Sequence, residues 1–172
     1  MTRADATTPD PADPLARAPY TAYRTGVRTD WIDYNGHMND AAYAQVLTDA
    51  NESFLAALGL SAEYRATTGC GLYTVETHIR FLREVSQSDE LSAQTLLVEH
   101  DAKRVRLHTT LVDASGGEVA TGESLYLNVD QAAGKVSPFP EERAATLALV
   151  QQVHEVVERP SHLGDGVAAP RR

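Results

Sequence analysis

The clearest pattern in the chain is a helical repeat of apolar residues from Asp40 to Leu58. Apolar side chains recur there every three or four positions, so they form one face of a helix that can be buried. Asn39 is a suitable N-cap, and Gly59 follows the last turn, where a left-handed glycine often ends a helix. The sequence predicts a long amphipathic helix whose buried face carries Tyr43, Val46, Leu47, Ala50, Phe54, Ala57 and Leu58.

After this helix the repeat changes to period two, which is typical of half-buried strands. Similar alternating runs cover about 89–99, 104–113 and 118–129, and a first strand is expected before the helix, from Tyr20 to Thr29. Short connections make consecutive strands antiparallel, and the glycine pair at 114–117 is a hairpin signal. In the strand directly after the helix, the side chains expected on one face are Tyr73, Val75, Thr77, Ile79 and Phe81.

A second amphipathic helix is expected from Glu141 to about Val157. The order of elements predicts an α+β architecture, in which one antiparallel sheet of five strands wraps around the long central helix. Residues 1–19 are rich in proline, alanine and small polar residues, and we expect them to be a disordered leader. Residues 20–157 should form a single domain, and residues 158–172 a flexible tail.

Composition narrows the possible functions. The chain has 24 acidic and 15 basic residues and a formal charge of -9, so its field repels nucleic acid. The sequence contains no apolar run long enough to span a membrane and no signal-peptide pattern, which favours a cytoplasmic protein without membrane contact. The single Cys70 excludes an internal disulfide, and its glycine neighbours favour a tight turn over a nucleophile. The histidines lack metal-ligand spacing, so no metal is expected.

The segment before the central helix carries the candidate chemistry. Asp33, His37 and Asn39 lie within seven positions, around Gly36. A helix start exposes unpaired amide groups and partial positive charge, which can polarise a carbonyl, and a neighbouring carboxylate can act as base or nucleophile. This pattern indicates acyl transfer. Two structural interpretations stay open, because Asp33 could cap the turn at Asn35 and Asn39 could simply cap the helix.

This segment resembles hotdog-fold acyl-CoA thioesterases of the 4-hydroxybenzoyl-CoA thioesterase type. The resemblance covers about Val27 to Asp130. It implies a hotdog fold, an acyl-CoA substrate, no cofactor beyond the coenzyme A of the substrate, and a homodimer or homotetramer. The residues that carry it are Asp33-x-x-Gly36-His37-Met38-Asn39-x-x-x-Tyr43, Ile79-Arg80-Phe81-Leu82-Arg83, Asp89-Glu90-Leu91, Val105-Arg106-Leu107-His108 and Ala120-Thr121-Gly122-Glu123.

Within that family the chain is most similar to betainyl-CoA thioesterases of bacterial carnitine degradation. Many hotdog proteins have a proline near Glu84 and a glycine near Ser88, and this chain departs at both. The resemblance implies hydrolysis of a small polar acyl-CoA, with betainyl-CoA as the expected substrate. A hotdog hydratase or dehydratase and a non-catalytic acyl-CoA-binding protein are the alternatives. The segments similar to the narrower group are 72–78, 82–85, 100–104 and 138–140.

The resemblance also implies roles for catalytic residues. Asp33 would be the nucleophile or the general base for water, with His37 and Asn39 as polar partners. Another branch of hotdog thioesterases uses a carboxylate on the central helix, which makes Asp49 and Glu52 rivals to Asp33. Because glycine permits close approach of the backbone to a ligand, the expected oxyanion donors are the amides of Gly36, His37 and Met38.

Substrate contacts are expected from other parts of the chain. Lys103 and Arg104, at a strand start, could meet the phosphates of coenzyme A. A trimethylammonium acyl group would need aromatic faces and a carboxylate. The candidates for substrate binding are Trp31, Tyr34, Tyr73 and Glu76, together with Tyr43 of the motif.

Overall fold

The computed structural model describes residues 17–167. A six-stranded antiparallel sheet has the order β1-β3-β4-β5-β2, and the short β6 pairs with β5 outside this path. The elements in chain order are β1 (Arg24–Gly26), a 3-10 turn (Thr29–Trp31), α1 (Asp40–Ala57), α2 (Ala62–Thr68), β2 (Cys70–Phe81), β3 (Glu90–His100), β4 (Arg104–Asp113), β5 (Glu118–Asp130), β6 (Lys135–Val136) and α3 (Glu141–His154).

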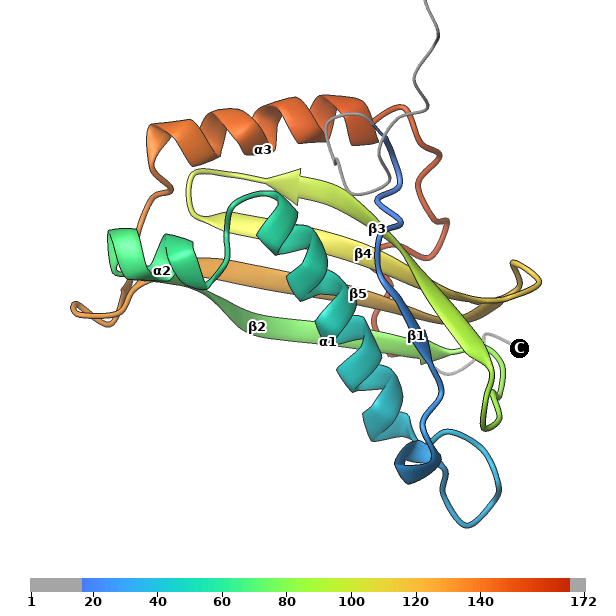
Figure 1. The fold of residues 1–172 in the computed structure, drawn as a ribbon. Coiled ribbons are helices and arrows are strands. Elements are labelled where there is room, and N and C mark those ends of the chain that lie inside the picture. Colours follow the sequence, from blue (N-terminus) through green and yellow to red (C-terminus); the bar gives the residue numbers. More distant parts are fainter. Residues whose placement is uncertain (1–16, 168–172) are drawn as a thin grey trace, which may run out of the picture.

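The predicted central helix is confirmed to within one residue. α1 crosses one face of the curled sheet, and α3 lies beside β3 (Figure 1). The Asn39 side chain caps α1 by accepting a hydrogen bond from the amide of Ala42. Gly59 has φ of +70°, the left-handed conformation that glycine adopts readily. The predicted architecture, one antiparallel sheet curled around a central helix, is therefore correct.

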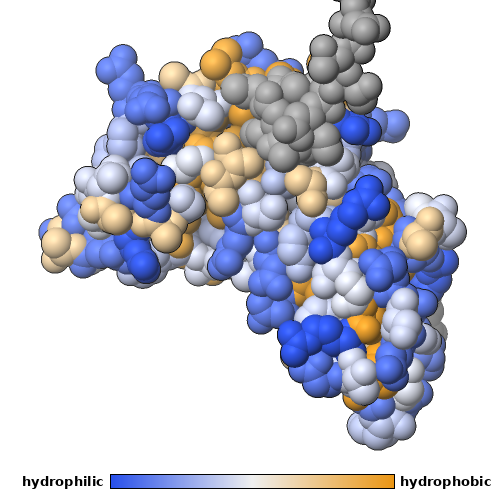
Figure 2. All heavy atoms as spheres, viewed as in Figure 1, coloured by the Kyte–Doolittle hydropathy of each residue, from blue (hydrophilic) through white to orange (hydrophobic). Residues whose placement is uncertain are grey.

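Two apolar clusters hold α1 against the sheet. Around the first half of the helix, Val46 and Leu47 pack with Val119 of β5. Around the second half, Phe54 packs with Leu147 of α3. The surface outside these clusters is mostly hydrophilic on the face that carries α1 (Figure 2).

β2 contains a bulge that the period-two pattern does not predict. Thr74 pairs with Tyr126 and Glu76 pairs with Leu125, so Val75 is the extra residue. Paired residues on adjacent strands share a face, and one inserted residue moves every later side chain to the other face. Tyr73 is therefore not on the same face as Thr77, Ile79 and Phe81, and the single predicted face is wrong.

Several other elements differ from the expectations. The first strand is only Arg24–Gly26, and α3 ends at His154. α2 and β6 were not predicted, because each is too short to show a repeat. Cys70 is the first residue of β2, and the tight turn falls on Gly69, which has φ of +70°.

The segment after α3 contacts the sheet as far as Asp165, which pairs with Arg80 of β2. Arg159 donates to the carbonyl of Val98, and the amide of Gly164 donates to Glu123 Oε2 at 2.9 Å. The flexibility expected for this tail stays a prediction. Most of the expected leader, residues 1–16, lies outside the described residues, as does the end of the tail, residues 168–172.

Candidate active site

The loop before α1 is a tight turn that places Asp33 and His37 next to each other. The amide of Asp33 donates to the carbonyl of His37 at 3.0 Å, and the amide of Gly36 donates to the carbonyl of Asp33 at 3.0 Å. Gly36 has φ of +85°, which few other residues tolerate. Tyr34, at the tip of the turn, has 97% of its surface exposed.

Asp33 and His37 line one open cleft of about 510 Å³. Its opposite wall is the end of β2 and the loop that follows, Phe81 to Glu84. The sequence predicted the first wall and missed the second. Phe81, Leu82 and Arg83 do belong to a segment that resembles the family, so that resemblance was a usable signal.

The Asp33 carboxylate has two hydrogen bonds within its own turn. Its Oδ1 accepts from the amide of Asn35 at 2.7 Å, and its Oδ2 accepts from the Asn35 side chain at 3.3 Å. The turn-capping role considered for Asp33 is thus present. An ionised carboxylate offers about four acceptor positions, so it can also accept from a water or approach a carbonyl in the cleft.

Asn39 does not line this cleft. Its Oδ1 accepts from the amide of Ala42 and its Nδ2 donates to the carbonyl of Trp31, both within 2.9 Å. Both polar ends of the side chain are therefore occupied in capping α1 and holding the loop. A direct part in the chemistry would require one of these bonds to break.

Two of the three predicted oxyanion donors are already used. The amide of Gly36 donates to Asp33, and the amide of Met38 donates to the carbonyl of Val85 at 2.9 Å. An oxyanion role for either amide would require its present hydrogen bond to break, so these two assignments stay predictions. Within residues 17–167, the amides of His37 and Asp40 donate no hydrogen bond and are the remaining candidates at the helix start.

Tyr43 lines the cleft, but its hydroxyl already has a hydrogen-bond partner. Its hydroxyl donates to the carbonyl of Arg83 at 3.1 Å, and its ring meets Phe81 edge-on with centroids 5.4 Å apart. Burial raises the pKa of Tyr43 above its usual value. Phe81 keeps 54% of its surface exposed and is the aromatic face available in this cleft.

The other aromatic candidates lie elsewhere. Trp31 packs against the core, and the Arg28 guanidinium lies 5.3 Å from its ring centroid. Tyr73 lines a second cleft of about 440 Å³, together with Glu52, Leu72 and Tyr126. Within a single chain, Trp31 and Tyr73 therefore do not line the Asp33 cleft.

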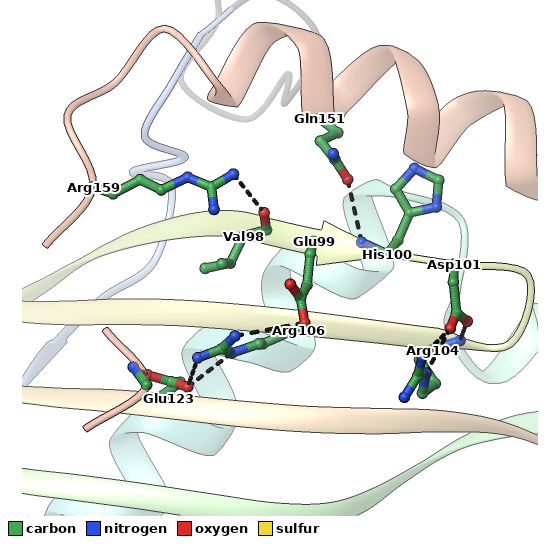
Figure 3. A network of polar contacts seen from close by, with 10 residues as sticks. Val98, Glu99, His100, Asp101, Arg104, Arg106, Glu123, Gln151 and Arg159 are labelled. Atoms are coloured by element: carbon green, nitrogen blue, oxygen red, sulfur yellow. Dashed lines mark hydrogen bonds and ion pairs between the residues drawn. The ribbon is translucent and has the colours of Figure 1, made fainter. Parts of the chain in front are cut away.

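Glu76 lies on the face opposite α1, because it alternates with Thr77, which shares the α1-facing side of the sheet with Ser124. It lines a third hollow of about 440 Å³ with Glu99, Arg106 and Glu123. In Figure 3 the Arg106 side chain lies between Glu99 and Glu123. Glu76 does not line the Asp33 cleft of its own chain, so its role as a substrate contact stays a prediction.

Lys103 and Arg104 lie at the far end of the sheet from Asp33. Arg104 is level with Tyr73 along the strands, whereas Phe81 is level with Leu111, seven residues further along β4. At about 3.3 Å per residue this separates the two levels by about 23 Å. The Arg104 side chain also binds Asp101, with Nε 2.6 Å from Oδ2 (Figure 3).

Asp49 and Glu52, the α1 carboxylates considered as alternatives to Asp33, have different surroundings. Asp49 accepts hydrogen bonds from Gln45 at 2.6 Å and from Tyr23 at 3.4 Å, so it links α1 to the segment before β1. Glu52 lies in the Tyr73 cleft. Neither lines the Asp33 cleft.

Residues 17–167 contain neither a metal-binding cluster nor a membrane-spanning helix. Residues 17–167 contain no group of three or more histidine, cysteine, aspartate or glutamate side chains arranged to hold a metal. No helix in this range is long and apolar enough to cross a membrane.

A sheet curled around one helix, with a carboxylate and an imidazole where that helix begins, is the architecture of a hotdog thioesterase. The sequence profile of the thioesterase-like superfamily matches residues 27–147. The chain belongs to this superfamily.

Two named relatives are similar to most of this chain. A protein of Agrobacterium fabrum named L-carnitine dehydrogenase/betainyl-CoA thioesterase is 40% identical over 153 residues, which are 89% of this chain and 31% of the relative. A betainyl-CoA thioesterase of Pseudomonas aeruginosa is 33% identical over 151 residues, 87% of this chain and 95% of the relative. The chain thus spans under a third of the first relative and nearly all of the second.

A solved structure agrees with this comparison. A Staphylococcus aureus protein determined in complex with CoA superposes with a TM-score of 0.83 and 28% sequence identity. The superposition covers 90% of this chain and 99% of that one.

Proposed function

We propose that this chain is an acyl-CoA thioesterase that hydrolyses a small polar acyl-CoA, with betainyl-CoA as its substrate. The observation that carries the proposal is the shared cleft of Asp33 and His37 at the start of α1. Family membership and the names of the relatives support the reaction and the substrate. The reaction needs no resident cofactor, since coenzyme A arrives as part of the substrate. A single cysteine suits a reducing compartment such as the cytoplasm.

Asp33 can serve the reaction by either of two routes. It attacks the thioester carbonyl to form a mixed anhydride, or it removes a proton from the water that attacks. The amides of His37 and Asp40 lie where the developing oxyanion can be bound. Label recovered in the Asp33 carboxylate after a single turnover in ¹⁸O-water would require the anhydride route, with water attacking the aspartyl carbon of the anhydride.

Asp33→Asn tests the assignment with little structural change, since the new side-chain oxygen can still accept from the Asn35 amide. We expect kcat to fall by about 100-fold or more, with the melting temperature nearly unchanged. Asp30→Asn is the matched control, because Asp30 is an exposed carboxylate of the same segment that pairs with Arg28. A folded Asp33→Asn enzyme with wild-type turnover would rule out the assignment.

We also propose that the enzyme is a dimer joined through β2. This strand is twelve residues long and lies at the edge of the sheet, where none of residues 17–167 pairs with its outer side. Exposed edges of this kind are suited to pairing with a second chain. Apolar side chains on or beside it are about half exposed, namely Tyr73, Val75, Phe81 and Leu82.

Such pairing would complete the site. Two copies of β2 related by a two-fold axis run antiparallel, so the Tyr73 end of one copy lies beside the Phe81 end of the other. The partner's Tyr73 and Glu52 then approach the cleft of Asp33, and the partner's Lys103 and Arg104 come to the same end of the assembly. An aromatic ring and a carboxylate would suit a trimethylammonium group.

A substrate pair tests this recognition. Betainyl-CoA and 3,3-dimethylbutanoyl-CoA have acyl groups of the same shape, but only the first is charged. We expect Glu52→Gln to lower kcat/KM for betainyl-CoA by about tenfold and to leave the neutral analogue unchanged. An equal loss on both substrates would contradict charge recognition by Glu52.

The dimer has its own test. Val75→Lys places a charge in the middle of β2, and we expect a monomer by analytical ultracentrifugation and loss of thioesterase activity. Leu149→Lys is the matched control, because Leu149 on α3 is 53% exposed and Val75 is 51% exposed. A Val75→Lys protein that remains a dimer would refute pairing through β2.

A further inference from the structure

Glu84 lies in the loop after β2 and is held at a fixed place beside the candidate active site. The carbonyl of the preceding Arg83 accepts from the Tyr43 hydroxyl at 3.1 Å. The carbonyl of the following Val85 accepts from the amide of Met38 at 2.9 Å. Both bonds tie this short stretch of loop to the segment that carries His37, so the backbone at Glu84 cannot move independently of it.

The Glu84 side chain faces His37 across the mouth of the cleft. Its Oε2 lies 3.5 Å from His37 Nε2, and both residues line the cleft that contains Asp33. Within residues 17–167, this is the one ion pair of the His37 ring, and no side-chain hydrogen bond holds the ring. The side chains of His37 and Glu84 are 39% and 77% exposed.

We propose that Glu84 is a positioning residue for His37 in thioester hydrolysis. The carboxylate holds Nε2 on the side of the loop, so Nδ1 is the ring nitrogen presented to the substrate. A partner on one ring nitrogen fixes both the tautomer and the orientation of a histidine. This inference rests on the proposed function, and it adds a residue that neither the loop motif nor the family resemblance assigned to the site.

The Glu84–His37 contact is better suited to orienting the His37 ring than to stabilising the fold. Exposed ion pairs add little to folding because solvent screens both charges. Polar contacts in an empty site are often long and shorten when substrate binds and excludes water. The pair therefore gains strength in the closed complex, where a fixed ring orientation affects the reaction.

A double-mutant cycle tests whether Glu84 acts through His37. We expect Glu84→Gln to lower kcat by about tenfold with KM within about twofold, and Glu84→Asp to recover part of the loss. In a His37→Asn background, Glu84→Gln should change kcat by less than about twofold, because the group through which it acts is gone. Glu90→Gln, a carboxylate at the start of β3 outside the cleft, is the control and should match the wild type.

Two kinetic outcomes would overturn the proposal. An equal loss from Glu84→Gln in both backgrounds would mean that Glu84 acts independently of His37. An unchanged kcat in the wild-type background would mean that the carboxylate has no part in turnover. A melting temperature measured for each variant separates either result from misfolding.

A spectroscopic measurement separates this inference from the proposed function. In the ¹⁵N-labelled protein without substrate, the neutral His37 ring should carry its proton on Nε2, and Glu84→Gln should yield a mixture of tautomers. An identical tautomer signal in both proteins would overturn the positioning role even if the enzyme is active. If the tautomer changes as expected but no acyl-CoA is hydrolysed, the proposed thioesterase function is refuted, whereas the positioning of His37 by Glu84 is confirmed.

Discussion

His108 should make the protein sensitive to acid. It lies on β4, is 1% exposed, and its Nε2 is 3.2 Å from Nε2 of His162 in the segment after α3. Burial and, to a smaller extent, the neighbouring His162 lower the pKa of His108 from 6.5 to about 4, while Glu123 of β5 opposes the shift. Arg106 on the same strand also disfavours the charged ring.

The direction of the effect follows from proton uptake. Between about pH 6.5 and pH 4 the unfolded chain protonates this histidine and the folded protein does not, so acid favours unfolding. A difference of roughly 2.5 pKa units corresponds to about 3 kcal/mol once both states are protonated, and to about 2 kcal/mol between pH 7 and pH 4.5. Above pH 6.5 the ring is neutral in both states and contributes no pH dependence.

Urea unfolding followed by the fluorescence of Trp31, the single tryptophan, measures this loss at each pH. Other groups also titrate, including Glu123: burial raises its pKa, but hydrogen bonds from Gly164 and Arg106 outweigh this and the net pKa is lowered. The comparison is therefore with His108→Gln at the same protein concentration. We expect the wild type to lose about 2 kcal/mol more than this variant between pH 7 and pH 4.5. Parallel losses in the two proteins would refute the reasoning.

Two other substitutions probe the packing that supports the site. Asn51→Leu should lower the free energy of unfolding by about 2 to 4 kcal/mol in urea, because buried Asn51 accepts from Thr109 at 2.7 Å and donates to Tyr126 at 3.0 Å. Gly122→Ala should cost about 1 to 2 kcal/mol, since the new methyl group would lie 3.0 Å from Leu47. Gly166→Ala, where no atom lies within 4 Å of the added carbon, is its control. Losses below about 0.5 kcal/mol would contradict either argument.

Local sequence patterns determined much of the fold. The α1 helix, its Asn39 cap and the strands after it follow from spacing over a few neighbouring residues, and the structure agrees. The same local information placed Asp33 and His37 together, since only three residues separate them in one turn. These features depend on contacts within a short stretch of chain, which is why one sequence suffices to predict them.

The tertiary structure decided which residues face that turn. The bulge at Val75 depends on how β2 pairs with β5, about fifty residues later, and it places Tyr73 on the face opposite Ile79 and Phe81, against the pattern. Glu84 meets His37 only because the loop after β2 is tied to the start of α1. Periodicity carries no record of such long-range contacts, so the sequence determined one wall of the cleft and the folded chain supplied the other.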